Sequence, residues 1–208
     1  MIRVAIDINH VIRNINGQIL KYYKKDIDPD LDIEQIDTKE DIFKYLDFIT
    51  AEKKREFIYE DYPYEIFGCA KPIEKDLPGE INKWLYDLTN YEKDKVNIFY
   101  FGLGEDSLTI QSSFFFLSKI GTRVRKIIFP ETDEEVINQS DVIISTDGKL
   151  LSKAEGKYRI LIKTKFNEKY YGKFDKEYDS LSDLIKDTEI NDIWNNHVHG
   201  VENINEYE

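Results

Sequence analysis

Cysteine is nearly absent from this chain: Cys69 is the single one, so no disulfide can form within it. No apolar run is long enough to cross a bilayer, and Met1 leads into an apolar segment without the features of a secretion signal. We therefore expect a soluble protein in the cytoplasm or in a phage particle. Basic residues are also few, since 29 Lys and Arg stand against 41 Asp and Glu, a net charge of −12. Such a surface repels phosphates, which makes nucleic acid an unlikely partner and excludes a membrane as one.

Apolar and aromatic residues are plentiful enough for a folded core. Hydrophobic residues make up 41% of the 208 and aromatic residues 13%, which excludes a largely disordered chain. This length corresponds to one domain, or to one domain with a small insertion. The chain is rich in Ile, Lys, Asn and Tyr and poor in Ala, a composition compatible with an AT-rich genome such as those of many bacteria and phages.

Short apolar runs alternate with amphipathic segments along most of the chain. The runs predict strands at about 2–8, 96–101, 125–129, 142–146 and 158–163. Helical spacing predicts helices at about 14–25, 38–60, 77–88, 107–119, 132–139 and 180–186. This alternation predicts an α/β fold with a central parallel sheet covered on both faces. We expect a core of residues 1–11 and 76–190, a small helical insertion at 12–75, and an acidic tail at 191–208.

The first predicted strand runs directly into Asp7, Ile8, Asn9 and His10. A carboxylate at the carboxyl end of a buried strand lies where ligands bind in open α/β sheets. The segment resembles the first motif of the haloacid dehalogenase (HAD) phosphohydrolases, Asp-x-Asp-x-Thr/Val. The resemblance implies that Asp7 is the nucleophile. The second Asp of the motif, which is the general acid and base, is replaced here by Asn9.

Later segments follow the order of the same family. Residues 141–147 are similar to the strand that carries its fourth motif. Residues 159–167 and 178–185 are similar to the end of the 5′(3′)-deoxyribonucleotidase branch, where a strand leads to a loop ending in Asn and a short helix follows. The resemblance implies a Rossmann-like HAD core, with a helical cap inserted after the first strand and a Mg²⁺ site if the motifs are retained.

The departures from the family fall on its chemistry. The second motif requires Ser or Thr, where this chain has Phe101 or Gly102. The third requires Lys, where residues 129–135 are acidic. The fourth requires paired acids, and only Asp147 stands near that place. Loss of a general acid alone lowers a rate by roughly 10²–10⁴-fold, so the sequence predicts a protein that is not an efficient phosphatase.

Several residues have both a functional and a structural interpretation. Asp7 and Asp147 are candidate metal ligands, or Asp7 is a polar strand end held by backbone N–H groups. Gly102 and Gly104 can cradle a phosphate, or form an ordinary turn between strand and helix. His10 can act as an acid or base in place of Asn9, or point into the insertion. His197 and His199 with Glu202 can bind a metal, or be solvated in the tail.

Two surface features suggest contacts. Phe114, Phe115 and Phe116 are consecutive on a predicted helix and cannot all face one core, so one of them should meet the insertion or another chain. A local basic patch lies within the acidic chain and is either a binding feature or a solvated loop; its members are Lys163, Lys165, Lys169 and Lys173.

Three functional hypotheses follow. The first is a catalytically degenerate HAD-like protein that serves as a binding or structural component of a larger assembly, such as a phage particle, with other protein chains as partners and no cofactor. The second is a divergent Mg²⁺-dependent 5′-nucleotidase or phosphatase that uses Asp7 as its nucleophile. The third is a phosphate or nucleotide sensor without turnover. A fold alone does not decide among them.

Overall fold

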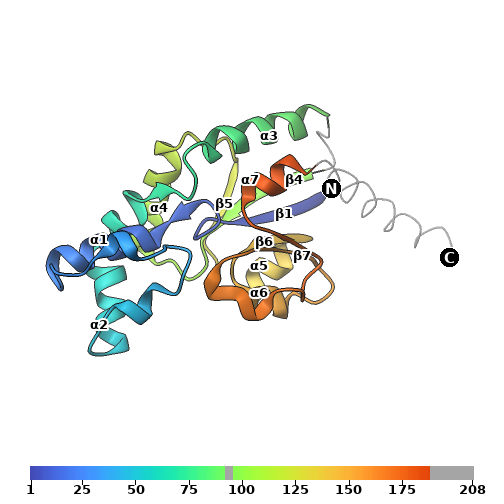
Figure 1. Cartoon of the computed structure of the whole chain (residues 1–208). Helices are drawn as coiled ribbons and strands as arrows, with labels where there is room; N and C mark the ends of the chain where they lie inside the picture. Colours follow the sequence, from blue (N-terminus) through green and yellow to red (C-terminus); the bar gives the residue numbers. More distant parts are fainter. Residues whose placement is uncertain (92–95, 188–208) are drawn as a thin grey trace.

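A computed structural model describes residues 1–91 and 96–187 of the chain. Its centre is a six-stranded sheet in the order β5-β4-β1-β6-β7-β8, in which every pairing is parallel (Figure 1). The strands are β1 (Ile2–Asp7), β4 (Val96–Phe101), β5 (Lys126–Ile128), β6 (Val142–Ser145), β7 (Tyr158–Ile162) and β8 (Lys176–Tyr178). The α/β fold with a parallel sheet is confirmed, as is the position of Asp7 on an inner strand between β4 and β6.

Helices cover both faces of the sheet, which explains why its strands are apolar on both sides. Val4 and Ile6 pack against α3 (Leu77–Tyr91), α4 (Ser107–Lys119) and α7 (Leu181–Lys186). Ala5 on the opposite face packs with residues of α5 (Asp133–Gln139) and α6 (Gly148–Lys153). Local side chains cap two of these helices: Asp106 accepts hydrogen bonds from backbone N–H groups in the first turn of α4, and Ser180 accepts one from the backbone N–H of Asp183 in α7.

The chain leaves β1 toward β4 and β5, and then crosses to the other side of the sheet for β6, β7 and β8. Connections that follow β1 and β6 therefore diverge to opposite sides. In open α/β sheets the crevice at such a switch point, outside the carboxyl ends of the strands, is where ligands bind. Asp7 at the end of β1 and Ser145 at the end of β6 flank this point.

Residues 12–75, called the insertion below, lie between β1 and α3 and carry a buried cluster of their own. Its elements are β2 (Arg13–Asn14), α1 (Ile15–Asp26), η1 (Ile33–Gln35), η2 (Ile42–Tyr45), α2 (Ala51–Glu56), η3 (Phe57–Asp61), η4 (Tyr64–Gly68) and β3 (Lys71–Pro72). Strands β2 and β3 pair antiparallel where the insertion begins and ends. Figure 1 shows α1 and α2 beyond the carboxyl end of β1.

The single helix predicted over 38–60 is wrong, because the structure has η2, α2 and η3 there. The side chains of Asp41 and Thr50 each accept a hydrogen bond from a backbone N–H and start new helical segments inside the predicted one. Of its expected apolar stripe, Ile42 and Leu46 are buried, whereas Ile49 is 91% exposed. Residues 61–72, for which no helix was predicted, contain the π-helical turn η4, and helix α6 and strand β8 were not predicted.

Candidate functional site

Asp7 lies at the floor of the site and is 7% exposed. Its Oδ1 accepts a hydrogen bond from the backbone N–H of Asn9 at 3.0 Å, and its Oδ2 accepts one from the Ser145 hydroxyl at 2.7 Å. Burial, with a smaller contribution from the negative charges of Asp147 and Glu105, raises the pKa of Asp7 to about 7 against the lowering effect of these two hydrogen bonds. Near neutral pH the carboxyl group is therefore divided between its protonated and ionised forms.

A cavity of about 370 Å³, called the Asp7 cavity below, opens above this carboxyl group. Its walls come from the loops that follow β1, β4, β6 and β7, as expected at the switch point. The lining residues are Asp7, Asn9, His10, Leu103, Thr146, Asp147, Gly148, Lys149, Phe166, Asn167, Lys169 and Tyr170. Two of these are exposed lysines, Lys149 and Lys169, so the rim carries positive charge above a buried acid.

Asn9, at the position of the missing acid, is held by a hydrogen-bond network. Its Nδ2 donates to Glu105 Oε1 at 3.1 Å. Its Oδ1 accepts from Arg13 Nε at 3.1 Å and from Arg13 Nη2 at 2.5 Å. Both polar ends of the amide are thus bound to side chains of the protein, and a carboxamide does not titrate as an acid or a base near neutral pH. The arrangement therefore provides no general acid at this position.

Arg13 and Glu105 form an ion pair of 2.7 Å, with side chains 0% and 1% exposed. Glu105 follows β4, three residues after Gly102. A Cβ atom on Gly102 would lie 2.5 Å from Glu105 Oε1, so Ser or Thr cannot replace Gly102 without displacing that carboxylate. Sequence reasoning missed this pair. The available signals were a lone Arg13 directly after the apolar Val11 and Ile12, and an acid three residues after Gly102.

The backbone N–H groups of the two candidate phosphate-binding glycines are occupied. Gly102 donates to the carbonyl of Ile128 at 3.1 Å, and Gly104 donates to the carbonyl of Pro130 at 3.0 Å. Gly104 has a φ of +69°, which favours glycine. These contacts favour the ordinary turn between strand and helix over an anion cradle.

Asp147 follows β6 and caps α6, where its Oδ1 accepts from the backbone N–H of Lys149 at 2.7 Å and of Leu150 at 3.3 Å. Both oxygens of Asp7 and Oδ1 of Asp147 therefore accept hydrogen bonds from protein groups. Within residues 1–91 and 96–187, no three His, Cys, Asp or Glu side chains are arranged to hold a metal. The second candidate metal set of His197, His199 and Glu202 lies outside the described residues.

His10 has a left-handed backbone, with φ of +63°, and its ring packs edge-on against Phe166 at 5.3 Å between centroids. Burial lowers its pKa to about 4, helped by the positive charge of Arg13. The lowered pKa favours the neutral imidazole at physiological pH, which disfavours His10 as a general acid. It lines the Asp7 cavity and also a side crevice of about 10 Å³, room for about one water.

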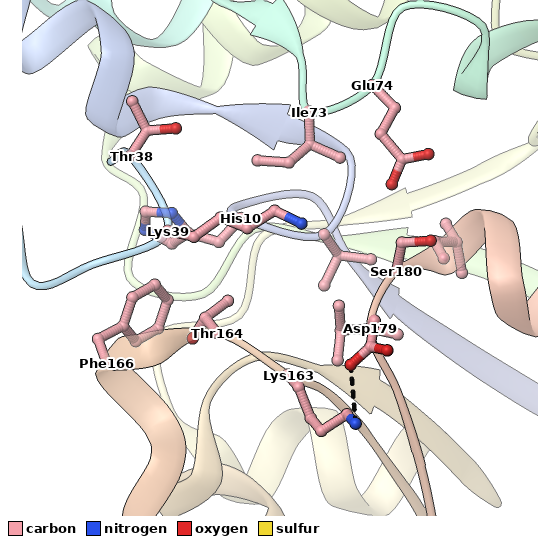
Figure 2. Close-up of a pocket in the computed structure, with 13 residues that line it drawn as sticks. His10, Thr38, Lys39, Ile73, Glu74, Lys163, Thr164, Phe166, Asp179 and Ser180 are labelled. Atoms are coloured by element: carbon pink, nitrogen blue, oxygen red, sulfur yellow. Dashed lines mark ion pairs between the residues drawn. The ribbon is translucent and has the colours of Figure 1, made fainter. Parts of the chain in front are cut away.

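Figure 2 shows the side crevice, which lies between the insertion and the core. Thr38, Lys39, Ile73 and Glu74 of the insertion face Lys163, Thr164 and Asp179 of the core across it. The predicted basic patch is split here. Lys163 pairs with Asp179 at 2.7 Å, Lys165 pairs with Glu40 and Asp37 of the insertion, and Lys169 lies on the rim of the Asp7 cavity.

The three consecutive phenylalanines of α4 have different surroundings. Phe116 is fully buried in the core. Phe115 meets Tyr64 of the insertion at 5.2 Å between ring centroids, so the prediction that one ring contacts the insertion is confirmed. Phe114 packs against Phe129 at 5.3 Å. Phe114 and Phe115 remain 49% and 43% exposed, and with Leu108 and Tyr64 they are the exposed large apolar residues of α4 and η4.

None of the helices in the described part of the chain combines the length and the apolar character needed to cross a membrane. No protein-family model matches the sequence, and no curated protein is significantly similar to it. The interpretation of the site therefore depends on its geometry.

Proposed function

We propose that this protein is a catalytically degenerate member of the HAD-like α/β proteins that acts by binding, as a component of a larger assembly, and not by hydrolysing phosphate esters. The observation that carries the proposal is the state of Asn9. Its amide is bound on both sides by the buried Arg13–Glu105 pair, so the position that should transfer a proton has a structural role.

Two further features support the proposal. The carboxylate of Glu105 occupies the space that a phosphate-binding Ser or Thr at Gly102 would need. Within the described residues, no three His, Cys, Asp or Glu side chains are arranged to hold a metal. Since proton transfer and charge stabilisation act on the same transition state, their joint loss lowers phosphoryl transfer by several orders of magnitude.

The contact surface that we propose comprises the exposed apolar residues of α4 and η4, Tyr64, Leu108, Phe114 and Phe115. Partly exposed aromatic residues of this kind are enriched in protein–protein interfaces. The partners are other protein chains, in the cytoplasm or in a particle. A phage particle is one candidate setting, suggested by the composition.

A second candidate is a divergent Mg²⁺-dependent nucleotidase with Asp7 as the nucleophile. The observation in its favour is that Asp7 lies at the floor of a cavity of about 370 Å³ with two lysines at the rim. Cavities of this size at a switch point suit small ligands.

Hydrolysis of deoxynucleoside monophosphates with Mg²⁺, by the wild type and by Asp7→Asn, separates the two candidates. We expect no difference between the two proteins. A wild-type turnover of order 1–10³ s⁻¹ that Asp7→Asn abolishes would instead establish the nucleotidase. Light scattering of the purified chain, compared with Phe114→Ser and Phe115→Ser, tests whether the apolar surface supports association.

A further inference from the structure

Several polar contacts attach the insertion to the core, among them hydrogen bonds from Lys119 Nζ on α4 to the carbonyls of Gly68 and Ala70, and one from the Ser182 hydroxyl to Glu74. Two others differ in burial. At one of them Lys165 on the core pairs with Glu40 at 2.7 Å and with Asp37 at 3.2 Å, and its backbone N–H donates to the carbonyl of Lys39 at 3.0 Å. The Lys165 side chain is 55% exposed. Ion pairs of this kind contribute little and are screened by salt.

The other attachment is the guanidinium of Arg13, which is fully buried. A guanidinium has five N–H donors, and each one here has an acceptor. Nε and Nη2 donate to Asn9, and Nη2 also donates to Glu105. Nη1 donates to the carbonyl of Phe67 at 3.0 Å and to the hydroxyl of Ser113 at 2.6 Å.

These acceptors belong to different parts of the fold. Asn9 follows β1, Glu105 follows β4 and Ser113 is on α4, whereas Phe67 is on η4 in the insertion. The rings of Phe67 and Phe116 lie 5.0 and 5.4 Å from the guanidinium carbon and cover it from both parts. Element η4 also approaches α4 closely, since a Cβ atom on Gly68 would lie 3.3 Å from the carbonyl oxygen of Ser112.

We propose that Arg13 is a latch that locks the insertion against α4, so that insertion and core behave as one rigid body. The residues that line the Asp7 cavity include none from 12–75, so the locked insertion sits beside this cavity. The buried Arg13–Glu105 pair thus has a mechanical role, which rests on the proposed function: it holds the contact surface formed by α4 and η4 in one arrangement. Phe115 of α4 and Tyr64 of η4 both belong to that surface and contact each other.

The test is amide hydrogen exchange of the full chain, read by mass spectrometry for η4 (Tyr64–Gly68) and for the strands β1 and β6. In Arg13→Met and Glu105→Gln we expect exchange of η4 to rise by roughly 10²-fold or more while β1 and β6 stay protected, because breaking a buried pair leaves an unpaired group. Lys165→Met and 1 M NaCl, which weaken the exposed attachment, should change exchange of η4 much less. Lys53→Met, which removes an exposed ion pair within the insertion, is the matched control.

The proposed role of Arg13 is refuted if the exchange rate of η4 stays at the wild-type level in Arg13→Met and Glu105→Gln. It is also wrong if η4, β1 and β6 all lose protection together, since Arg13 would then stabilise the whole fold. If the single variants fail to fold, the double variant Arg13→Met/Glu105→Gln replaces them, because it leaves no buried charge at the pair. The same comparison of exchange in η4 with exchange in β1 then tests the proposal.

Discussion

Replacing Asp7 by Asn should stabilise the protein at neutral and alkaline pH. The carboxyl group of Asp7 is buried and has a pKa of about 7, compared with an ordinary value of 3.8. Between these two values the folded state holds a proton that the unfolded chain releases. The free energy of unfolding therefore falls as the pH rises through this range, and above pH 7 the favourable contribution of the protonated group is lost.

The size of the effect follows from the two pKa values. They differ by about three pH units, and each unit corresponds to 1.36 kcal/mol. Ionised Asp7 thus destabilises the fold by about 4 kcal/mol at pH 8 relative to its protonated form. Asn is a neutral replacement of the same shape, so Asp7→Asn should recover most of this amount at pH 8 and almost none at pH 4.

Urea unfolding of the wild type and Asp7→Asn at several pH values between 4 and 8 measures this difference. Asp141→Asn is a control for which we expect a change in stability of opposite sign, because the hydrogen bond from Arg3 lowers the pKa of Asp141. Removing the Asp141 carboxylate should destabilise the protein at neutral pH, and this loss of stability should diminish as the pH falls below 4. A difference between Asp7→Asn and the wild type that does not change with pH would refute the reasoning.

Two packing predictions accompany it. Gly102→Ser should destabilise the fold by roughly 2–4 kcal/mol in urea unfolding, because its Cβ would displace the buried carboxylate of Glu105; a neutral result would show that the ion pair moves aside easily. Phe116→Ala should cost about 3–5 kcal/mol, whereas Phe114→Ala, which truncates a half-exposed ring, should cost less than about 1 kcal/mol. Equal losses for the two would contradict the assignment of Phe116 to the core and Phe114 to the surface.

Five of the six strands of the sheet could be predicted from sequence, because each is a local apolar run such as that of β1, whereas the polar strand β8 carries no such run. The cap of α4 by Asp106 likewise involves neighbouring residues. Local pattern did not predict the structure of residues 38–60. There Phe48 and Phe57 pack against the ring of Tyr23, which is distant in sequence, and internal caps at Asp41 and Thr50 interrupt the helix.

The site was predictable only in part, for a related reason. The place of Asp7 follows from its position after a buried strand. Its partner Ser145 lies 138 positions along the chain, and the Arg13–Glu105 pair joins residues 92 apart. Such contacts leave no periodic signal. The sequence showed that Asn9 lacks a carboxylate, whereas only the structure shows what its amide binds.

The most direct test of the central claim is hydrolysis of a deoxynucleoside monophosphate with Mg²⁺ by Asn9→Asp. This substitution restores the missing acid of the HAD motif but not its surroundings. The new carboxylate would meet Glu105, whose Oε1 lies 3.1 Å from Asn9 Nδ2, and would be held by Arg13. We expect turnover no higher than that of Asp7→Asn. Turnover of order 1 s⁻¹ or more in Asn9→Asp, abolished when Asp7→Asn is added, would contradict the claim that the site has lost its chemistry.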